Sequence, residues 1–157
     1  MKYHEIKDLL RQCHGFATLC EEDLDLMAKC GVNAVFREGQ LLAQEGHPAD
    51  LFYLIRNGKV AIETHVPHRG TVTLQSLGTG EVVGWSWLFP PYLWMFDVRA
   101  LEDTRVISLD GKCLREKCEA NHSLGFRLMK TFMGTLVARV HDARLQVLDV
   151  YHSPQGG

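Results

Sequence analysis

The chain has 157 residues, of which 46% are hydrophobic and 23% are charged, and this is the composition of one globular domain with a core of its own. These proportions exclude a disordered tail, a collagen-like fibre and a coiled-coil rod. The formal net charge is only −2, which argues against a dedicated nucleic-acid binder, because such proteins carry a strong basic excess.

Residues 1–31 are predicted to form two N-terminal helices. Apolar side chains recur at spacings of three and four between Ile6 and Cys13, and Gly15 breaks this pattern. The second helix follows over 21–30, where three acidic residues at its start suit the positive end of the helix dipole. The N-terminus is charged and lacks the apolar segment of a secretory signal, so we expect a cytoplasmic protein.

The chain contains an odd number of cysteines and no apolar segment long enough to cross a membrane. The cysteines are Cys13, Cys20, Cys30, Cys113 and Cys118. Their spacings lack the C-x2-C pair that is usual for iron–sulfur ligands, which favours buried structural thiols in a reducing compartment. The longest apolar-rich run, 82–96, has 15 residues and contains two prolines, whereas a spanning helix needs about 20. We therefore expect no membrane partner.

Residues 32–110 are predicted to form a β domain. Short segments rich in β-branched and aromatic residues follow one another, with glycine-containing turns between them. Asn57-Gly58, between two apolar runs, is the strongest short signal for a hairpin, and 67–70 is predicted to be a longer hairpin loop. Because no helical segment separates these strands, the pattern predicts a sandwich, a barrel or a jelly roll.

Residues 111–151 are predicted to be helical again, and 152–157 to form a disordered tail. Ser123 is the expected N-cap of a helix that continues to about residue 150. One apolar stripe runs along this helix: Met129, Phe132, Leu136, Val140, Ala143 and Val147. A long amphipathic helix at a chain end often pairs with its twin, so we expect a homodimer through this stripe. The alternative is a helix that packs only on its own β domain.

Four motifs in the β region carry a family resemblance. They are Phe36-Arg37-Glu38-Gly39-Gln40, 51–55, Gly58-Lys59-Val60 and 77–84. In this order and spacing they resemble the cyclic-nucleotide-binding domain of the catabolite-activator and fumarate-nitrate-regulator superfamily, over roughly residues 15–151. The resemblance implies a mainly β fold, in which a double-stranded β-helix, or jelly roll, lies between N-terminal helices and a long C-terminal helix that dimerises. Residues 1–151 would then form a single domain.

The resemblance also bears on the kind of function. In transcription factors of this superfamily a winged helix-turn-helix follows the long helix, and this sequence stops where that module would begin. We therefore expect a stand-alone regulatory or sensor domain that makes no contact with nucleic acid. No nucleophile–base pair, P-loop or dinucleotide-binding motif is present in the sequence, so we expect no enzymatic activity.

The resemblance places the ligand site directly after Gly84. Cyclic-nucleotide binders carry there a glutamate for the ribose hydroxyl, a short helix that presents N–H groups to the anion, and an arginine for the cyclic phosphate. Here Trp85 follows Gly84, and Trp94 stands at the arginine position in the register counted back from Arg99. Loss of both polar anchors costs several kcal/mol, on the order of a thousandfold in affinity. We therefore expect a small ligand other than a cyclic nucleotide, or a cyclic nucleotide that is bound in an atypical way.

An unusual concentration of aromatic residues marks the predicted pocket. Six of the 14 aromatic residues fall within 85–96, and pockets are mostly apolar with a few polar groups. The expected ligand-binding residues are Gly84, Trp85, Ser86, Trp87, Trp94, Phe96, Arg99 and Arg144, the last of them on the long helix. The alternative is that the indoles fill the pocket as core, which would leave a ligand-free dimerisation or protein-interaction module.

Two lesser alternatives involve a metal. His65 and His68 form the closest histidine pair, but they straddle a proline at a hairpin, which favours solvated loop histidines over a cupin-type metal site. The other alternative is a redox sensor with an iron–sulfur cluster, or with haem held by a histidine such as His141. Neither pattern has the spacing of a ligand set, so no cofactor and no metal is predicted.

Overall fold

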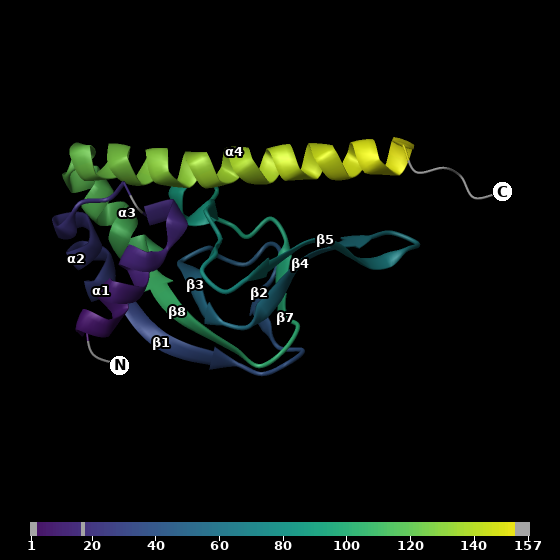
Figure 1. The fold of residues 1–157 in the computed structure, drawn as a ribbon, viewed down its shortest axis with the longest axis horizontal. Coiled ribbons are helices and arrows are strands. Elements are labelled where there is room, and N and C mark those ends of the chain that lie inside the picture. The colour runs from purple at the N-terminus through teal and green to yellow at the C-terminus, as the bar shows by residue number, and fades with distance from the viewer. Residues whose placement is uncertain (1–2, 17, 153–157) are drawn as a thin grey trace.

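The computed structural model describes residues 3–16 and 18–152, apart from the side chains of His14 and His152, so the predicted tail from 153 onward lies outside the described residues. The described chain opens with three helical segments, α1 (Tyr3–Gln12), the 3-10 helix η1 (His14–Phe16) and α2 (Glu21–Lys29). It closes with α3 (Gly111–Ala120) and α4 (His122–His152). The N-terminal helices, α3 and the start of α4 lie together at one end of the β domain (Figure 1).

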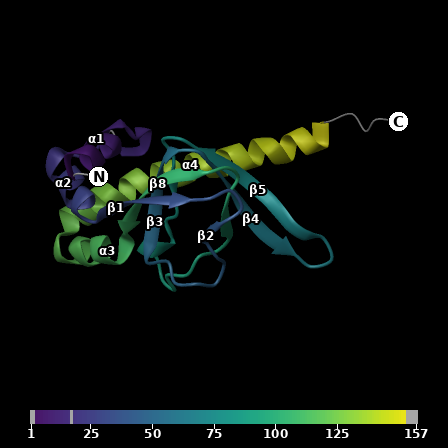
Figure 2. The ribbon, with the colours of Figure 1, turned by 90° about the horizontal axis from the view of Figure 1, so that it is seen from below.

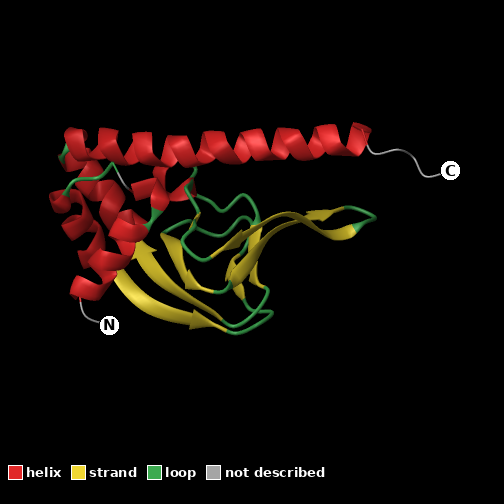
Figure 3. Cartoon of the chain, viewed as in Figure 1, coloured by secondary structure: helices red, strands yellow, loops and turns green. Residues whose placement is uncertain are grey.

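Within the described residues, eight strands form the β domain (Figure 3). They are β1 (Gly31–Phe36), β2 (Leu41–Ala43), β3 (Leu51–Asn57), β4 (Lys59–Val66), β5 (Gly70–Gly78), β6 (Val82–Val83), β7 (Asp97–Ala100) and β8 (Thr104–Asp110). Their pairings are antiparallel and give two four-stranded sheets, in the orders β1-β8-β3-β6 and β2-β7-β4-β5. The mainly β jelly-roll fold that the sequence predicts is confirmed.

The turn at Asn57-Gly58 does not close a hairpin. β3 pairs with β6 and β8, whereas β4 pairs with β5 and β7, so the chain passes from one sheet to the other at this turn. Gly58 has a φ of +126°, and a Cβ there would lie 2.8 Å from the Cα of Thr104. The predicted hairpin is wrong because turn residues do not select the pairing partner of a strand. The predicted loop at 67–70 is confirmed, because it joins the paired strands β4 and β5.

Two apolar clusters form the core. One lies between the helices and the first sheet, and in it Trp87 is fully buried and stacks on Phe52 with ring centroids 4.7 Å apart. Phe132 of α4 packs edge-on against both of these rings and is only 5% exposed. The other cluster lies between the two sheets and contains Tyr53 and Trp94. Phe132 thus belongs to the core of its own chain, which corrects its expected place on a dimer face.

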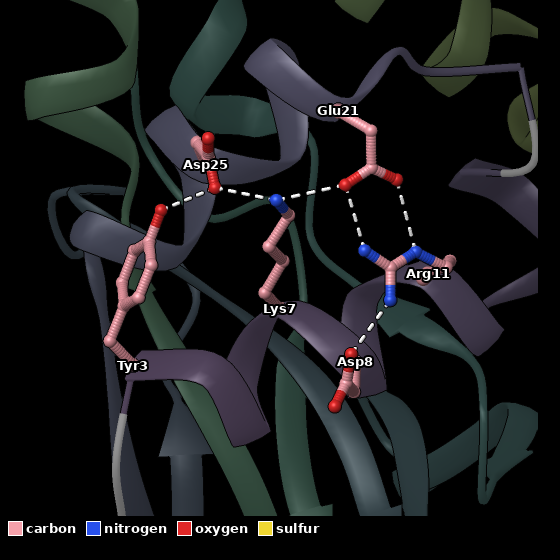
Figure 4. Close-up of polar contacts among 6 residues, drawn as sticks. All are labelled: Tyr3, Lys7, Asp8, Arg11, Glu21 and Asp25. Carbon is pink, nitrogen blue, oxygen red and sulfur yellow. Dashed lines mark hydrogen bonds and ion pairs between the residues drawn. The ribbon is translucent and has the colours of Figure 1, made fainter.

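Ion pairs fasten α1 to α2 (Figure 4). The ammonium group of Lys7 lies 2.8 Å from carboxylate oxygens of both Glu21 and Asp25, and an Arg11 nitrogen lies 2.8 Å from Glu21. Tyr3 donates a further hydrogen bond to Asp25. Hydrogen bonds from Arg11 and Lys7 lower the pKa of Glu21 to about 2. The two N-terminal helices are therefore held together by charge as well as by their apolar faces.

Asn121 caps the start of α4. Its Oδ1 accepts a hydrogen bond of 3.2 Å from the backbone N–H of Leu124, so Asn121 takes the role that was expected of Ser123. In the next turn, Arg127 donates two hydrogen bonds, of 2.6 and 2.8 Å, to the buried carboxylate of Asp23 on α2. The far end of α4 reaches beyond the body of the β domain (Figures 1 and 2). Among the described helices, none is both long and apolar enough to cross a membrane.

Candidate ligand-binding site

Gly84 turns the chain after β6. Its φ is +99°, in the left-handed region that favours glycine. A Cβ at this position would lie 2.5 Å from the indole of Trp94, far inside ordinary van der Waals contact. The ring of Trp94 therefore rests directly on the Gly84 backbone, and no side chain fits between them.

The tryptophans on either side of Ser86 lie in different surroundings. Trp85 is half-buried, and its ring meets Phe96 edge-on with centroids 6.1 Å apart. Trp87, in the short 3-10 helix η2 (Ser86–Leu88), is enclosed by the apolar core, and Ser86 is also buried. Trp85 faces the middle of α4, where Arg139 lies over its ring, whereas Trp87 meets Phe132 nearer the start of that helix.

A cavity of about 170 Å³ lies between the β domain and α4. The β domain contributes Ile62, Leu74, Gln75, Trp85 and Phe96 to its walls, and α4 contributes Arg139, Ala143 and Gln146. Of the residues predicted for the ligand site, Trp85 and Phe96 line this cavity. Ala143, predicted for the dimer stripe, lines it as well.

The other predicted site residues lie elsewhere. Arg99 donates hydrogen bonds to Glu63 at 2.9 Å and to the carbonyl of Gly39 at 2.7 Å, on the outer face of the second sheet. Arg144 is exposed on α4, because it follows a cavity-lining residue by one position and points about 100° away around the helix. Trp94 faces the interior of the β domain and a separate cavity of about 340 Å³ beside β2. Neither predicted arginine therefore reaches the cavity under α4.

The model of the cyclic nucleotide-binding domain family matches residues 34–121, which is more than half of the chain. The chain belongs to this family. A structure from Geobacter metallireducens GS-15, described as a cyclic nucleotide-binding protein, is 30% identical with a TM-score of 0.78, over 86% of this chain and 98% of that chain. The family resemblance drawn from the sequence motifs is thereby confirmed.

Two further structures share the fold of this cyclic nucleotide-binding domain. A cyclic nucleotide-binding domain from Methylobacillus flagellatus KT is 20% identical with a TM-score of 0.77, over 93% of this chain and 82% of that chain. The sensor domain of the transcriptional regulator DNR from Pseudomonas aeruginosa is 17% identical with a TM-score of 0.71, over 88% of this chain and 93% of that chain. No curated protein sequence matches the chain.

Arg139 is the candidate site residue that the sequence analysis missed. It donates a hydrogen bond to the carbonyl of Val82, and its guanidinium carbon lies 5.0 Å from the ring centroid of Trp85. Burial lowers the pKa of Arg139, because the charged form loses water, while the charges of Glu81 and Cys13 act in the opposite direction. A cation is thus placed in the wall of the cavity on the family's ligand side of the domain.

The position of Arg139 in the sequence carried a usable signal. It follows Leu136 by three residues and precedes Ala143 by four, so it lies within the apolar spacing of the helix. Apolar spacing alone does not reveal a cation that lies within the stripe. An arginine at such a position must either extend to water or be buried against a polar group, and the latter is found here.

The rest of the predicted dimer stripe is accessible. Met129, Val140 and Val147 are exposed, and Leu136 is half-buried. Further exposed apolar residues lie beside them on the same helix: Met133, Val137, Leu148, Val150 and Tyr151. α4 therefore packs one face on its own chain and leaves an apolar face uncovered.

The described histidine and cysteine side chains lie in separate parts of the fold. Within residues 3–16 and 18–152, no group of three or more histidine, cysteine or acidic side chains could hold a metal ion. His141 lies on the exposed part of α4, and His65 and His68 lie at the end of β4 and in the turn after it. These histidines do not converge with the cysteines that flank α2 or with those of α3.

Proposed function

We propose that this cyclic nucleotide-binding domain is a regulatory sensor whose cavity under α4 takes a small, flat, anionic ligand other than a cyclic nucleotide. The observation that carries the proposal is the composition of the cavity wall. Trp85 and Phe96 provide aromatic surfaces on one side, and Arg139 provides a half-buried positive charge on the other. Pockets of this kind bind a flat apolar body and select it by its charged group.

The tryptophans argue against ordinary cyclic-nucleotide binding. The resemblance calls for a glutamate after Gly84, where the chain has Trp85, and the ring of Trp94 occupies the space above the glycine backbone. Arg99, the basic residue closest in sequence, is already paired with Glu63. Each charge-assisted hydrogen bond that is missing removes about 1.5–3 kcal/mol. A cyclic nucleotide would therefore enter this site without its usual polar partners.

Arg139 favours an anionic ligand. Its guanidinium group is half-buried against a carbonyl and an aromatic ring, and this partial burial lowers its pKa. A carboxylate or sulfonate in the cavity would compensate the charge that burial has stripped of water. The volume of about 170 Å³ suits a ligand of one or two rings more than a whole nucleotide.

The same helix would carry the signal. Arg139, Ala143 and Gln146 line the cavity, while Val140 and Val147 are exposed on the adjoining face of α4. A ligand that binds one position of α4 more tightly than another shifts the population of helix arrangements. We infer that the protein is a homodimer through this uncovered face and that the ligand changes the geometry of the helix pair.

The proposal is tested by calorimetric titration with naphthalene-2-sulfonate, an aromatic anion of two rings. We expect saturable binding to the native full chain, weakened at least several-fold by Arg139→Met. The matched control is Arg144→Met, which removes the same charge from the same helix outside the cavity. Equal binding by both variants would overturn the assignment of Arg139, and the lack of saturable binding would overturn the ligand site.

A second candidate function follows from the packing of Trp94 on Gly84. If the indoles serve only as core, the domain is a ligand-free interaction module that acts through α4. In that case neither the aromatic anion nor a cyclic nucleotide binds, while the homodimer persists. That combination of results would favour the interaction module over the sensor.

A further inference from the structure

Two thiols that are far apart in the sequence meet between α2 and α3. Cys30 follows the last residue of α2, and Cys113 lies in the first turn of α3. Their sulfur atoms are 3.3 Å apart, although 83 positions separate the two residues. A disulfide bond has a length of about 2.05 Å, so the sulfurs need approach by only about 1.2 Å.

Backbone hydrogen bonds hold the chain segments that carry the two cysteines next to each other. The N–H of Asp110 donates a hydrogen bond of 2.8 Å to the carbonyl of Cys30, and Gly31 pairs with Leu109 across β1 and β8. The Asp110 carboxylate accepts a hydrogen bond of 2.9 Å from the N–H of Cys113 and caps α3. Rotation of the two side chains can therefore bring the sulfurs together while these hydrogen bonds persist.

The surroundings give the two sulfurs different properties. Cys30 is buried, and desolvation together with the hydrogen bond to Cys113 raises its pKa to about 11, which the nearby Lys117 opposes. The ammonium group of Lys117 lies 3.4 Å from the Cys30 sulfur. Cys113 is half-exposed in the first turn of α3. Cys113 is thus the sulfur that a reagent in solution meets first.

We propose that Cys30 and Cys113 are an oxidation site at which a hydroperoxide forms a disulfide between α2 and α3. The Cys113 thiolate attacks the peroxide, the O–O bond breaks, and the departing oxygen leaves as water or an alcohol while Cys113 becomes a sulfenic acid. The Cys30 sulfur then attacks Cys113, the S–S bond forms, the S–O bond breaks, and the hydroxyl leaves as water with the proton that Cys30 gives up. Two thiols are oxidised by two electrons and one peroxide is reduced.

Lys117 acts on the second step as a positioning residue. Its positive charge stabilises Cys30 as a thiolate at the moment of attack, where burial alone would hold the proton on the sulfur. The resulting bond would enclose the whole β domain in a covalent loop and tie α2 to the helices that lead into α4. This site is separate from the cavity under α4, and its oxidation needs no ligand there.

The experiment maps disulfides in the reduced full chain after treatment with hydrogen peroxide. Remaining thiols are alkylated under denaturing conditions, and the chain is cleaved with trypsin without reduction. Cleavage after Lys29, Arg37, Lys112 and Arg115 releases the two cysteines in the short peptides 30–37 and 113–115. We expect these peptides joined by a disulfide, and separated again by dithiothreitol.

Variants distinguish the oxidation of Cys113 to a sulfenic acid from the attack of Cys30 that forms the disulfide. Lys117→Met is expected to slow disulfide formation several-fold and to raise the labelling of Cys113 by a sulfenic-acid reagent, and Lys117→Arg is expected to restore the rate. Cys118→Ser, on the same helix, is the control that keeps the pair and the cross-link. Recovery of peptides 30–37 and 113–115 fully alkylated, or joined only between two molecules, would overturn the proposal. An unchanged rate in Lys117→Met would overturn the role of Lys117.

Discussion

The indole of Trp94 rests on the backbone of Gly84, where a Cβ would come within 2.5 Å of the ring. We expect Gly84→Ala to lower the free energy of unfolding by about 2–4 kcal/mol, because a left-handed φ and a displaced ring are both unfavourable. The control is Gly39→Ala, since Gly39 has a φ of +88° but no atom within 4 Å of its Cβ position. Urea unfolding measures both, and equal losses would contradict the close contact at Gly84.

Trp85 and Trp87 are close in sequence but should differ in their contribution to stability. Trp87 is fully buried and stacked on Phe52, so Trp87→Ala is expected to lower the free energy of unfolding by about 3–5 kcal/mol. Trp85 is half-buried beside the cavity, so Trp85→Ala is expected to lower it by about 1 kcal/mol and to weaken binding of the aromatic anion. Thermal and urea unfolding decide the matter, and a larger loss in Trp85→Ala would contradict the two placements.

Between elements, one contact that is sensitive to pH joins α2 to α4. Hydrogen bonds from Arg127 hold the pKa of the buried Asp23 carboxylate below its usual range. The stability that this pair contributes is complete above the usual carboxylate pKa, near pH 4, and is lost as the pH falls through the lower value of the folded state. We expect Asp23→Asn to lower the free energy of unfolding by about 2 kcal/mol at pH 7.

Urea unfolding at pH 7 and pH 3 checks this prediction. The wild-type chain should lose more stability between the two values than Asp23→Asn, because the variant has no carboxylate to protonate at this contact. The control is Asp8→Asn, which removes an exposed partner of Arg11 and should change the free energy of unfolding by less than about 0.5 kcal/mol. An equal acid sensitivity in wild type and Asp23→Asn would contradict the role of this ion pair.

The sequence predicts where the strands and helices lie, but not which strands pair with one another. Glycine spacing and β-branched runs predict the strands and the helical ends, because turns and burial leave local patterns. The same patterns could not show that Asn57-Gly58 joins two sheets, since the partner of a strand is chosen by distant segments such as β8. They also could not place Arg99 on the outer face, which depends on the pairing of β7 with β4.

For the whole molecule, the uncovered apolar face of α4 predicts the assembly. Val147 is 56% exposed on this face, and a charge there would be buried in a dimer without a partner. We expect the 17.8 kDa wild-type chain to sediment as a dimer and Val147→Glu as a monomer. Leu145→Glu is the control, because Leu145 is similarly exposed but points about 160° away from Val147 around the helix. A monomeric wild type, or equal effects of both variants, would contradict a dimer through this face.

The same helix, α4, carries both a wall of the cavity and the uncovered apolar face. Arg139 holds α4 to β6 through the carbonyl of Val82, and the face that carries Val140 and Val147 moves with the same helix. An anionic ligand that pairs with Arg139 would alter the hydrogen bond from Arg139 to the carbonyl of Val82. The proposed signalling mechanism therefore requires no change inside the two sheets, only a new position of α4 on them.

The central claim is that the site lacks the polar partners that a cyclic nucleotide needs. Calorimetric titration of cyclic AMP into the purified, nucleotide-free chain tests this claim most directly. The substitution of tryptophans for the polar anchors, together with the pairing of Arg99 with Glu63, predicts no heat of binding up to millimolar concentration. Micromolar binding would contradict this, because it would show that backbone N–H groups and Arg139 replace the anchors that the sequence lacks.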